Sequence, residues 1–405
     1  MRDDALWVVH TLREAGFEAL LAGGCVRDML LGLHPTDYDV ATNATPEQVA
    51  GLFKRVLMVG AKFGVAMVMR RRRTIEVATF RDDLSYADGR RPTGVRFSSP
   101  REDALRRDFT INGMFYDPVT EDVIDYVGGQ GDLRTGVIRA IGDPDRRMAE
   151  DYLRLLRAVR FAARFDFTLE TATREAIERH APHLARISGE RIRDELEKML
   201  AGANPAAAMA QVHGLGLAEP IFGARIADEA SWQVIMRRLE LLADQRDPTL
   251  SLACILADAD VRTIRRLCRH WGAPNDLRDG LVHLATNLPR WKTAADLPLP
   301  TFKRFMASPT WNRLRKLWQV EERRLTGRDT QSRAIARRGD GIDPAQVAPP
   351  PLVTGDDLKE LGLTEGPLLG RALRTLYDEQ LDERLTSREQ AMARAEALVR
   401  ETKET

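Results

Sequence analysis

The amino-acid sequence predicts an α+β protein, in which a mixed α/β head is followed by a part made almost entirely of helices. Up to about residue 137, short apolar runs typical of strands alternate with amphipathic patterns typical of helices. From about residue 146 to residue 396, strand patterns nearly vanish and amphipathic helices dominate. Because 405 residues are too many for one hydrophobic core, we expect two to four domains in series.

The head is predicted to begin with a helix and then to build a sheet from short strands. Its expected elements are, in order, an amphipathic helix over residues 4–15, a strand over Ala19–Ala22, a helix over Val26–Leu31, and two strands over Val65–Met69 and Ile75–Phe80. The last two runs flank Arg70–Arg73 and therefore predict a β-hairpin.

The remainder is predicted to be an elongated all-α neck, body and tail. Examples of the expected helices are Asp151–Phe165, Leu169–His180, Ser188–Ala201 and Ala230–Ala243. The segment Gly339–Pro351 ends in three prolines and is typical of a linker, and a compact unit over Leu352–Leu398 follows it. We therefore divide the chain into a head (1–145), a neck (146–225), a body (226–338), to which the sequence assigns no role, and a tail (339–405).

Composition excludes several classes of protein. No stretch reaches the roughly 18 apolar residues of a membrane span, and the N-terminus lacks the apolar segment of a signal peptide, so we expect a cytoplasmic protein without membrane contact. The three cysteines, Cys25, Cys254 and Cys268, are far apart and argue against both a disulfide framework and a zinc site. No protein partner is implied, and the oligomeric state is left open.

The arginines are clustered, although the net charge is only +1. Clusters occur at Arg70–Arg73, Arg90-Arg91, Arg106-Arg107, and at Arg154, Arg157, Arg160 and Arg164. Local clusters, and not the net charge, decide whether a protein binds phosphates, so these segments predict a phosphate-bearing ligand.

Asp37 and Asp39 form a candidate metal site. In an extended strand, side chains two residues apart point to the same side, so the two carboxylates would converge on one point. Mg²⁺ beside substrate phosphates is held by one or two carboxylates. Glu76, in the second strand of the predicted hairpin, is a candidate third carboxylate, although its spacing fits an exposed strand position equally well.

Two glycines, Gly23 and Gly24, lie where the first predicted strand turns into a helix. Glycine allows backbone N–H groups to approach a phosphate closely, and Arg27 would add a charged fork. A simple tight turn is the alternative explanation. Together with the two aspartates, this segment predicts phosphoryl transfer, in which metal ions activate an attacking hydroxyl and stabilise a pyrophosphate leaving group.

Five ordered motifs lie between residues 22 and 200. They are Gly23–Gly32 with Asp37 and Asp39, Arg106–Met114, Asp125–Gly129 with Asp132, Glu150–Phe161, and Ser188–Ile192 with Glu195 and Leu196. Together they resemble the bacterial tRNA nucleotidyltransferase and poly(A) polymerase family, the class II branch of the polymerase β-like nucleotidyltransferases. The resemblance implies a polymerase β-like head with a mixed sheet, Mg²⁺ as the cofactor, and transfer of nucleotides from CTP and ATP to the 3′ end of an RNA.

The resemblance also implies roles for individual side chains. It places the following residues at the nucleotide: Gly24, Arg27, Arg107, Asn112, Asp151, Arg154, Arg157 and Arg160. Arg107 would bind the triphosphate, and Asn112 would position the sugar or a neighbouring loop. Arg157 and Arg160 would contact the nucleotide or RNA phosphates. The last motif, around Arg191 and Glu195, would support the helices without taking part in the chemistry.

Asp151 and Arg154 are expected to select the base without a template. Three positions apart on a helix, they would be neighbours on one face. A carboxylate accepts a hydrogen bond from an exocyclic amine, and a guanidinium donates one to an adjacent ring nitrogen. Cytosine and adenine both present an amine beside an acceptor nitrogen, whereas uracil and guanine present a carbonyl beside an N–H. On spacing alone, an ordinary surface ion pair is the alternative.

Three functions compete on the sequence. The first is addition of CCA, or of the terminal A alone, to tRNA; the second is polyadenylation of many RNAs; the third is RNA binding by a protein with an inactive head. Intact Asp37, Asp39 and Arg107 argue against the third. The segment Leu352–Gly370 resembles the tail of several bacterial CCA-adding enzymes, which favours tRNA as the substrate and implies that the tail (339–405) contacts the tRNA. Whether C addition, A addition or both are retained stays open.

The segment Asp83–Pro92 is predicted to be a surface loop because of its glycine, proline and close-set charges. In the family that the chain resembles, an acidic residue followed by paired arginines at this place is associated with enzymes that add A. The resemblance therefore implies that Asp83, Arg90 and Arg91 contribute to A addition.

Overall fold

The structure, a computed structural model, describes residues 1–58, 63–83, 94–242 and 246–403. The chain divides into two compact units. The first comprises Met1–Met236, Asp244–Pro248 and Arg269–Ala273, and the second comprises Arg237–Ala243, Thr249–Cys268 and Pro274–Thr405. The main boundary falls inside helix α13 (Glu229–Leu242). The first unit thus contains the predicted head and neck; the finer division into four domains stays a prediction.

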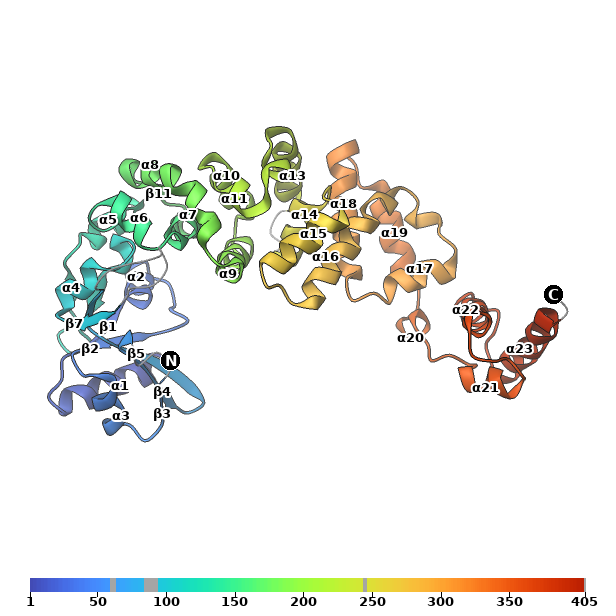
Figure 1. The fold of residues 1–405 in the computed structure, drawn as a ribbon, viewed down its shortest axis with the longest axis horizontal. Coiled ribbons are helices and arrows are strands. Elements are labelled where there is room, and N and C mark those ends of the chain that lie inside the picture. Colours follow the sequence, from blue (N-terminus) through green and yellow to red (C-terminus); the bar gives the residue numbers. More distant parts are fainter. Residues whose placement is uncertain (59–62, 84–93, 243–245, 404–405) are drawn as a thin grey trace. The chain divides into compact units, whose positions relative to one another are not determined.

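The first unit begins with a seven-stranded mixed sheet in the order β3-β4-β5-β2-β1-β8-β9 (Figure 1). Its strands are β1 (Ala19–Ala22), β2 (Asp39–Thr42), β3 (Val56–Leu57), β4 (Val65–Arg70), β5 (Arg73–Thr79), β8 (Met114–Tyr116) and β9 (Val123–Asp125). Strands β2 and β5 run parallel, whereas the other neighbouring pairs are antiparallel. The predicted mixed sheet, the strand over Ala19–Ala22 and the hairpin are confirmed.

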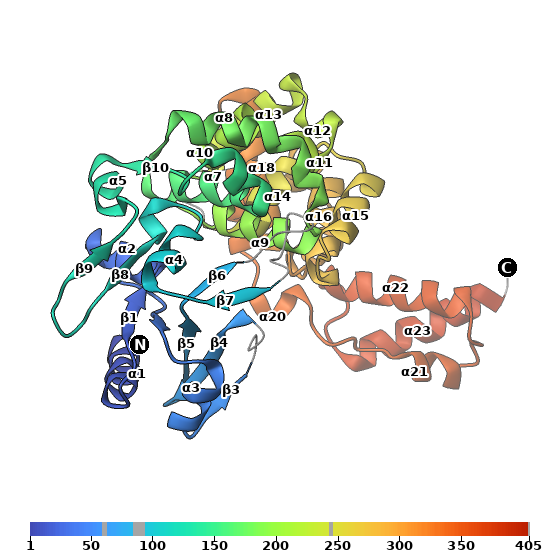
Figure 2. The same cartoon turned by 60° about the vertical axis from the view of Figure 1, so that its left-hand side comes forward.

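Helices pack on the sheet and complete the head. The head contains α1 (Arg2–Glu14), α2 (Gly24–Leu30), α3 (Pro46–Leu52), α4 (Pro100–Leu105), the 3₁₀ turn η2 (Thr110–Asn112) and α5 (Gly129–Thr135). Helices α1 and α3 pack on the sheet next to each other, through an edge-to-face contact of Trp7 with Phe53. Figure 2 shows the second, two-stranded ribbon of β6 (Arg81–Asp83) and β7 (Val95–Phe97) above the sheet.

The predicted loop Asp83–Pro92 lies almost wholly outside the described residues. Asp83 ends β6, and the next described residue is Gly94. Arg90 and Arg91 are therefore outside the described part of the chain, and their assigned role in A addition stays a prediction.

The neck continues the first unit with helices. These are α6 (Pro144–Glu150), α7 (Leu153–Phe165), α8 (Thr171–His180), η3 (Ala181–Arg186), α9 (Gly189–Leu200), α10 (Pro205–Gly214), α11 (Ala218–Phe222) and α12 (Ala224–Ala227), with a short parallel pair of β10 (Val137–Ile138) and β11 (Thr168–Leu169). Helix α7 packs against α9 and α10 through an apolar face that includes Leu155, Leu156 and Val159, all fully buried. Four arginines of α7, which are Arg154, Arg157, Arg160 and Arg164, line a cavity of the first unit.

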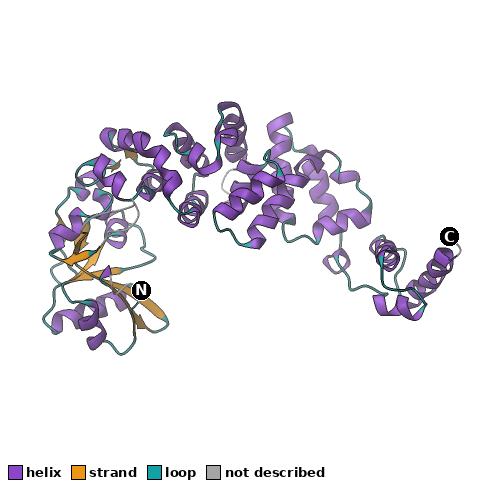
Figure 3. Cartoon of the chain, viewed as in Figure 1, coloured by secondary structure: helices purple, strands orange, loops and turns teal. Residues whose placement is uncertain are grey.

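The second unit has no strand among its described residues, as Figure 3 shows. After α13, the helices are α14 (Pro248–Leu256), α15 (Val261–His270), α16 (Asn275–Asn287), η4 (Leu288–Lys292), η5 (Ala294–Asp296), α17 (Leu299–Met306), α18 (Trp311–Thr326), α19 (Thr330–Asp340), α20 (Pro344–Val347), α21 (Gly355–Glu360), α22 (Pro367–Leu381) and α23 (Arg388–Lys403). None of the described helices is both long and apolar enough to cross a membrane.

The predicted compact unit at the C-terminal end has a hydrophobic core of its own. Its buried side chains are Val353, Leu358, Leu363, Ala372, Leu376, Leu385, Ala391, Ala395 and Val399. The predicted linker before it is more ordered than its composition indicates, because α20 lies inside it. In addition, Tyr377 and Gln380 of α22 donate hydrogen bonds to the carbonyls of Pro349 and Pro350. A proline has no N–H, but its carbonyl still accepts.

Four predicted helix starts differ from the structure by two residues. Helix α1 begins at Arg2 and not at residue 4, and α8 begins at Thr171 and not at Leu169, which lies in β11. Helix α2 begins at Gly24 and not at Val26, and α7 begins at Leu153 and not at Asp151. Asp151 has φ −152° and ψ 104°, which is extended backbone. Apolar periodicity locates a helix better than it locates its first residue, because the first turn depends on local capping.

A double glycine ties the start of α5 to the second motif. Gly128 has φ +80°, and a β-carbon on Gly129 would lie 2.3 Å from the carbonyl oxygen of Thr110 in η2. The Asp125 carboxylate accepts hydrogen bonds from four successive backbone N–H groups in this turn.

Gly129→Ala is expected to lower the free energy of unfolding by about 1–3 kcal/mol, because two backbone segments must separate. Gly131→Ala is a matched control, since its β-carbon would meet nothing within 4 Å in the same helix. Urea denaturation of the two variants compares the effects. Equal stabilities would contradict the close approach.

Candidate active site

A cavity of about 770 Å³ in the first unit contains every residue that the sequence predicts for the site. Its lining includes Gly24, Arg27, Asp37, Asp39, Glu76, Arg107, Asn112, Asp151, Arg154, Arg157 and Arg160. These side chains come from β2 and β5, the start of α2, the second motif and α7, which are far apart in the sequence. The fold therefore brings the predicted catalytic and nucleotide-binding residues to one place; their individual roles stay predictions.

Three of the carboxylates that line this cavity, those of Asp37, Asp39 and Glu76, come from β5 and the start of β2. Asp39 is the first residue of β2, and Asp37 precedes it by two residues. Both are exposed, whereas Tyr38 between them is buried, so the two carboxylates point to the same side as expected. Strand β5 pairs with β2 in parallel, and Val77 lies opposite Val40. Glu76 is therefore placed beside Asp39 on the neighbouring strand.

The charge of these carboxylates suits a divalent cation. Although solvent reaches Asp39, the protein around its carboxylate partly desolvates it; this desolvation and the nearby Glu76 carboxylate raise the pKa of Asp39 to about 6, and Asp37 adds to the repulsion. A bound cation would relieve that repulsion. In the described ranges, no three His, Cys, Asp or Glu side chains form a complete metal site. Asp37 and Asp39 would therefore share an ion with phosphate and water oxygens, as is common for Mg²⁺.

The glycines of the first motif allow a close approach of Arg107. Gly23 has φ +72°, and a β-carbon there would lie 2.7 Å from Nη1 of Arg107. Arg107 is held from the other side by Asp103 of α4, with 2.9 Å between Nη2 and Oδ2. Its guanidinium is thus fixed between the first motif and α4, where it faces the cavity that also contains the carboxylates.

The guanidinium of Arg27 is more deeply buried than a group that only binds phosphate would be. Its side chain is 5% exposed and lies over the rings of Phe161 and Phe165. Nη2 donates to Asp28 at 2.6 Å, and Nη1 donates to Oδ1 of Asn112 at 2.5 Å. Arg27 therefore joins the first motif to the second motif and to α7, which is a structural task that the sequence did not indicate.

The neck arginines are also paired with buried carboxylates. Arg157 contacts Asp108 at 2.6 Å, and Nε of Arg160 donates to Glu195 of α9 at 2.5 Å. Burial alone would raise the pKa of Asp108. The Arg157 guanidinium and a hydrogen bond from Asn112 outweigh this effect and hold the pKa well below its usual range. The pairing of Glu195 agrees with the supporting role expected of the last motif.

Sequence reasoning missed the acidic partners of the site. Asp28, Asp103, Asp108 and Glu150 each orient an arginine of the cavity, and three of them lie inside motifs that were recognised. Asp103 had a detectable signal, because it precedes Arg106 and Arg107 by three and four residues on one helix face. The partner of Arg157 is 49 residues away, so no local spacing could reveal it.

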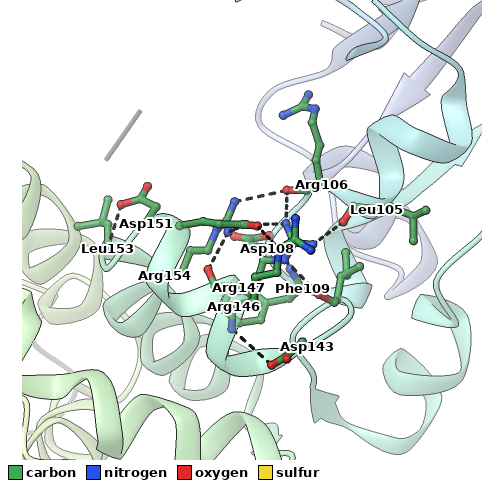
Figure 4. Close-up of polar contacts among 12 residues, drawn as sticks. Leu105, Arg106, Asp108, Phe109, Asp143, Arg146, Arg147, Asp151, Leu153 and Arg154 are labelled. Carbon is green, nitrogen blue, oxygen red and sulfur yellow. Dashed lines mark hydrogen bonds and ion pairs between the residues drawn. The ribbon is translucent and has the colours of Figure 1, made fainter. Parts of the chain in front are cut away.

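Asp151 and Arg154 lie close in sequence but have separate partners (Figure 4). Asp151 accepts from both Nη atoms of Arg191, at 3.2 and 2.6 Å. Arg154 donates to Glu150 at 2.7 Å and to the carbonyl oxygens of Arg147 and Arg106 at 2.8 and 3.3 Å. The prediction that Asp151 and Arg154 are neighbours on one helix face is wrong, because Asp151 precedes α7. Both side chains nevertheless line the same cavity.

A second cavity of about 620 Å³ continues from the first. The two share Arg160, Arg164 and Lys198, and Arg246 adds a fourth cation; among the described residues of this lining there is no carboxylate. Such a lining is suited to a chain of phosphates that leads to the candidate catalytic carboxylates.

Comparisons with known proteins agree with this geometry. Residues 19–139 match the family described as poly A polymerase head domain, and residues 166–229 match the probable RNA and SrmB-binding site of polymerase A. Poly(A) polymerase I of Salmonella typhi is 44% identical, but the match covers 54% of this chain and only 50% of that protein. The CCA-adding enzyme of Geobacillus stearothermophilus is 37% identical over 73% of this chain and 71% of its own length.

Similarity to a solved structure extends over nearly the whole chain. The CCA-adding enzyme of Bacillus stearothermophilus in complex with CTP has a TM-score of 0.80 and 29% identity, covering 99% of this chain and 98% of that one. The family resemblance that the five motifs indicate is therefore confirmed. This chain belongs to the bacterial class II family of CCA-adding enzymes and poly(A) polymerases.

Proposed function

We propose that this protein transfers CMP and AMP from CTP and ATP to the 3′ end of tRNA and releases pyrophosphate, adding either CCA or the terminal A. The observation that carries the proposal is the single cavity in which Asp37 and Asp39 face the arginines of the neck. The CCA-adding relatives support tRNA as the substrate, because the match to them covers more of the chain than the match to poly(A) polymerase I. This substrate places the protein in the cytoplasm.

Asp37 and Asp39 would hold Mg²⁺, which when bound lowers the pKa of the attacking 3′ hydroxyl and neutralises charge on the triphosphate. Around it, the residues of this chain position the reactants. Arg107, fixed by Asp103, supplies positive charge for the triphosphate. Asn112 is held between Arg27 and Asp108, and its place in the cavity suits the sugar or the adjoining loop. Glu76 adds negative charge beside Asp39.

Base selection rests on the hydrogen bonds that Asp151 and Arg154 can still make. Asp151 accepts three hydrogen bonds, from Arg191 and from the N–H of Leu153, out of about four that a carboxylate can take. Arg154 uses Nη1 twice and Nη2 once, which leaves Nε and one further N–H of its five donors for a ligand. Asp151 would accept a hydrogen bond from the exocyclic amine of the base, and Arg154 would donate one to the adjacent ring nitrogen. Cytosine and adenine present this pair of groups.

Poly(A) polymerase activity is the second candidate, favoured by the 44% identity to poly(A) polymerase I over half of each chain. Incubation with ATP and two RNAs, a tRNA ending in CC and an unstructured RNA, separates the candidates. We expect a single added nucleotide on the tRNA and little reaction with the unstructured RNA. A ladder of long products on both RNAs would favour polyadenylation.

Mg²⁺ affinity is expected to fall below pH 7. The metal binds ionised Asp39, and a pKa of about 6 means that protons compete with it as the pH falls. Between pH 7.5 and pH 5.5 the apparent affinity should drop about fourfold, in proportion to the ionised fraction. Isothermal titration at the two pH values measures this ratio. An affinity that is constant over this range would contradict the raised pKa.

Deletion of residues 83–91 is expected to abolish ATP incorporation on tRNA ending in CC. The charges of this segment would act on the neck when the pocket changes from cytosine to the larger adenine. CTP incorporation on tRNA lacking CCA, if the intact protein has it, serves as the control and should survive. Equal loss of both activities would mean that the loop supports only the fold.

A further inference from the structure

The hairpin of β4 and β5 ends in four consecutive arginines. Arg70 and Arg73 form its last residue pair, so Arg71 and Arg72 make up the two-residue turn. Their φ angles are +46° and +67°, in the left-handed region that such turns require. Asparagine and glycine are the residues favoured there, because a longer side chain makes this backbone unfavourable. The hairpin thus carries arginines where its own stability favours other residues.

The outer and the inner arginines of this turn differ in their contacts. Arg70 and Arg73 both reach Asp4 of α1, at 3.6 and 3.4 Å, and Arg70 lies 4.2 Å from the centre of the Trp7 ring. Arg71 and Arg72 are exposed, and within the described ranges no hydrogen bond or ion pair holds either of them. The outer pair therefore anchors the hairpin, and the inner pair is presented to solvent.

Two more cations lie beside the turn. The N–H of Met69 donates to the carbonyl of Arg55 at 2.9 Å, which places Lys54 and Arg55 next to the end of the hairpin. Both side chains are exposed. We call Lys54, Arg55, Arg71, Arg72 and Arg73 the basic hairpin end. Within the described ranges, the only ion pair that these five side chains form joins Arg73 to Asp4.

We propose that the basic hairpin end binds the phosphate backbone of the RNA substrate, away from its reacting 3′ end. The inference rests on the proposed function, which supplies a polyanionic substrate. Glu76 lies four residues after Arg72 on β5, about 13 Å along the strand. Arg71 and Arg72 are therefore too distant to touch the reacting phosphate, and they act on RNA affinity and not on the chemistry. Backbone that is unfavourable for its side chains is characteristic of functional positions.

The decisive variant is Arg71→Asn with Arg72→Gly, because it gives the turn its favoured residues while removing two charges. Its stability towards urea should equal or exceed that of the wild type. Its KM for tRNA should rise about tenfold or more, whereas kcat and the KM for CTP or ATP stay unchanged. The slope of log affinity against log salt concentration should become shallower by up to about two.

Two controls make the assignment testable. Arg71→Lys with Arg72→Lys keeps both charges and should keep most of the tRNA affinity. Arg134→Asn removes an exposed charge from α5 and should change nothing.

An unchanged KM for tRNA in the Asn-Gly variant of an active enzyme would overturn the inference and point to an acidic protein surface as the ligand instead. If the wild type adds no nucleotide to tRNA, the proposed function fails, and the salt dependence of tRNA binding alone decides on the hairpin.

Discussion

Replacing Asp37 or Asp39 with alanine is expected to abolish nucleotide incorporation while tRNA binding stays nearly intact. Each variant removes one of the two carboxylates that face the cavity from the start of β2. Loss of the metal's charge stabilisation costs about 4 kcal/mol or more in the transition state, which corresponds to about a thousandfold in rate. Incorporation of labelled CTP and ATP, with tRNA binding measured in parallel, tests the expectation. Either variant retaining a substantial share of wild-type activity in Mg²⁺ would refute the assignment.

A stability measurement shows whether lost activity reflects lost folding. Since burial and Glu76 raise the pKa of Asp39, the ionised form is less favourable in the folded protein than in the unfolded chain. Asp39 therefore contributes stability only when protonated, and this contribution is lost as the pH rises through about 6. Asp39→Asn should thus be inactive at pH 7.5 and yet, without metal, at least as stable as the wild type. An inactive and unfolded variant would leave the catalytic role unsupported.

Replacing Asp151 or Arg154 with alanine is expected to relax the choice of base. Incorporation of UTP or GTP relative to CTP and ATP should rise by about 10- to 100-fold, which corresponds to the loss of one hydrogen bond to a charged group. The fold supports this role by orienting each group separately, Asp151 through Arg191 and Arg154 through Glu150. Competition between the four nucleotides on one tRNA measures the ratio.

Arg191→Ala provides the matched control for base selection. It leaves Asp151 in place but removes its ion pair. Base choice should therefore relax less than in Asp151→Ala, while overall activity falls. If the Asp151 and Arg154 variants lose activity with unchanged base preference, the two residues have a structural role and the hydrogen-bond account is wrong.

The sequence predicted the parts of the site that depend on local geometry. Alternation along a strand was sufficient to place Asp37 and Asp39 on one side, and the apolar runs around Arg70–Arg73 located the hairpin. Asp151 was misplaced because a helix pattern does not show where its first turn begins. The convergence of all predicted residues in one cavity depended on the order of motifs that the family shares, and not on periodicity.

The ion pairs that hold the site together could not be predicted in the same way. Arg157 with Asp108, and Arg160 with Glu195, join residues that only tertiary packing brings together. The burial of Arg27 over the rings of Phe161 and Phe165 has the same origin. Many arginines of the cavity therefore have structural partners besides any ligand, which a list of motifs does not reveal.

The most direct test of the proposed function uses three forms of one tRNA: lacking the whole CCA end, lacking CA, and lacking only the final A. Each is incubated with the protein and Mg²⁺, with CTP and ATP supplied separately. We expect ATP to add one nucleotide to the tRNA that ends in CC. If C addition is retained, CTP will extend the two shorter forms up to CC and no further. No incorporation on any form, or unlimited addition of A to all three, would contradict transfer of C and A to the tRNA 3′ end.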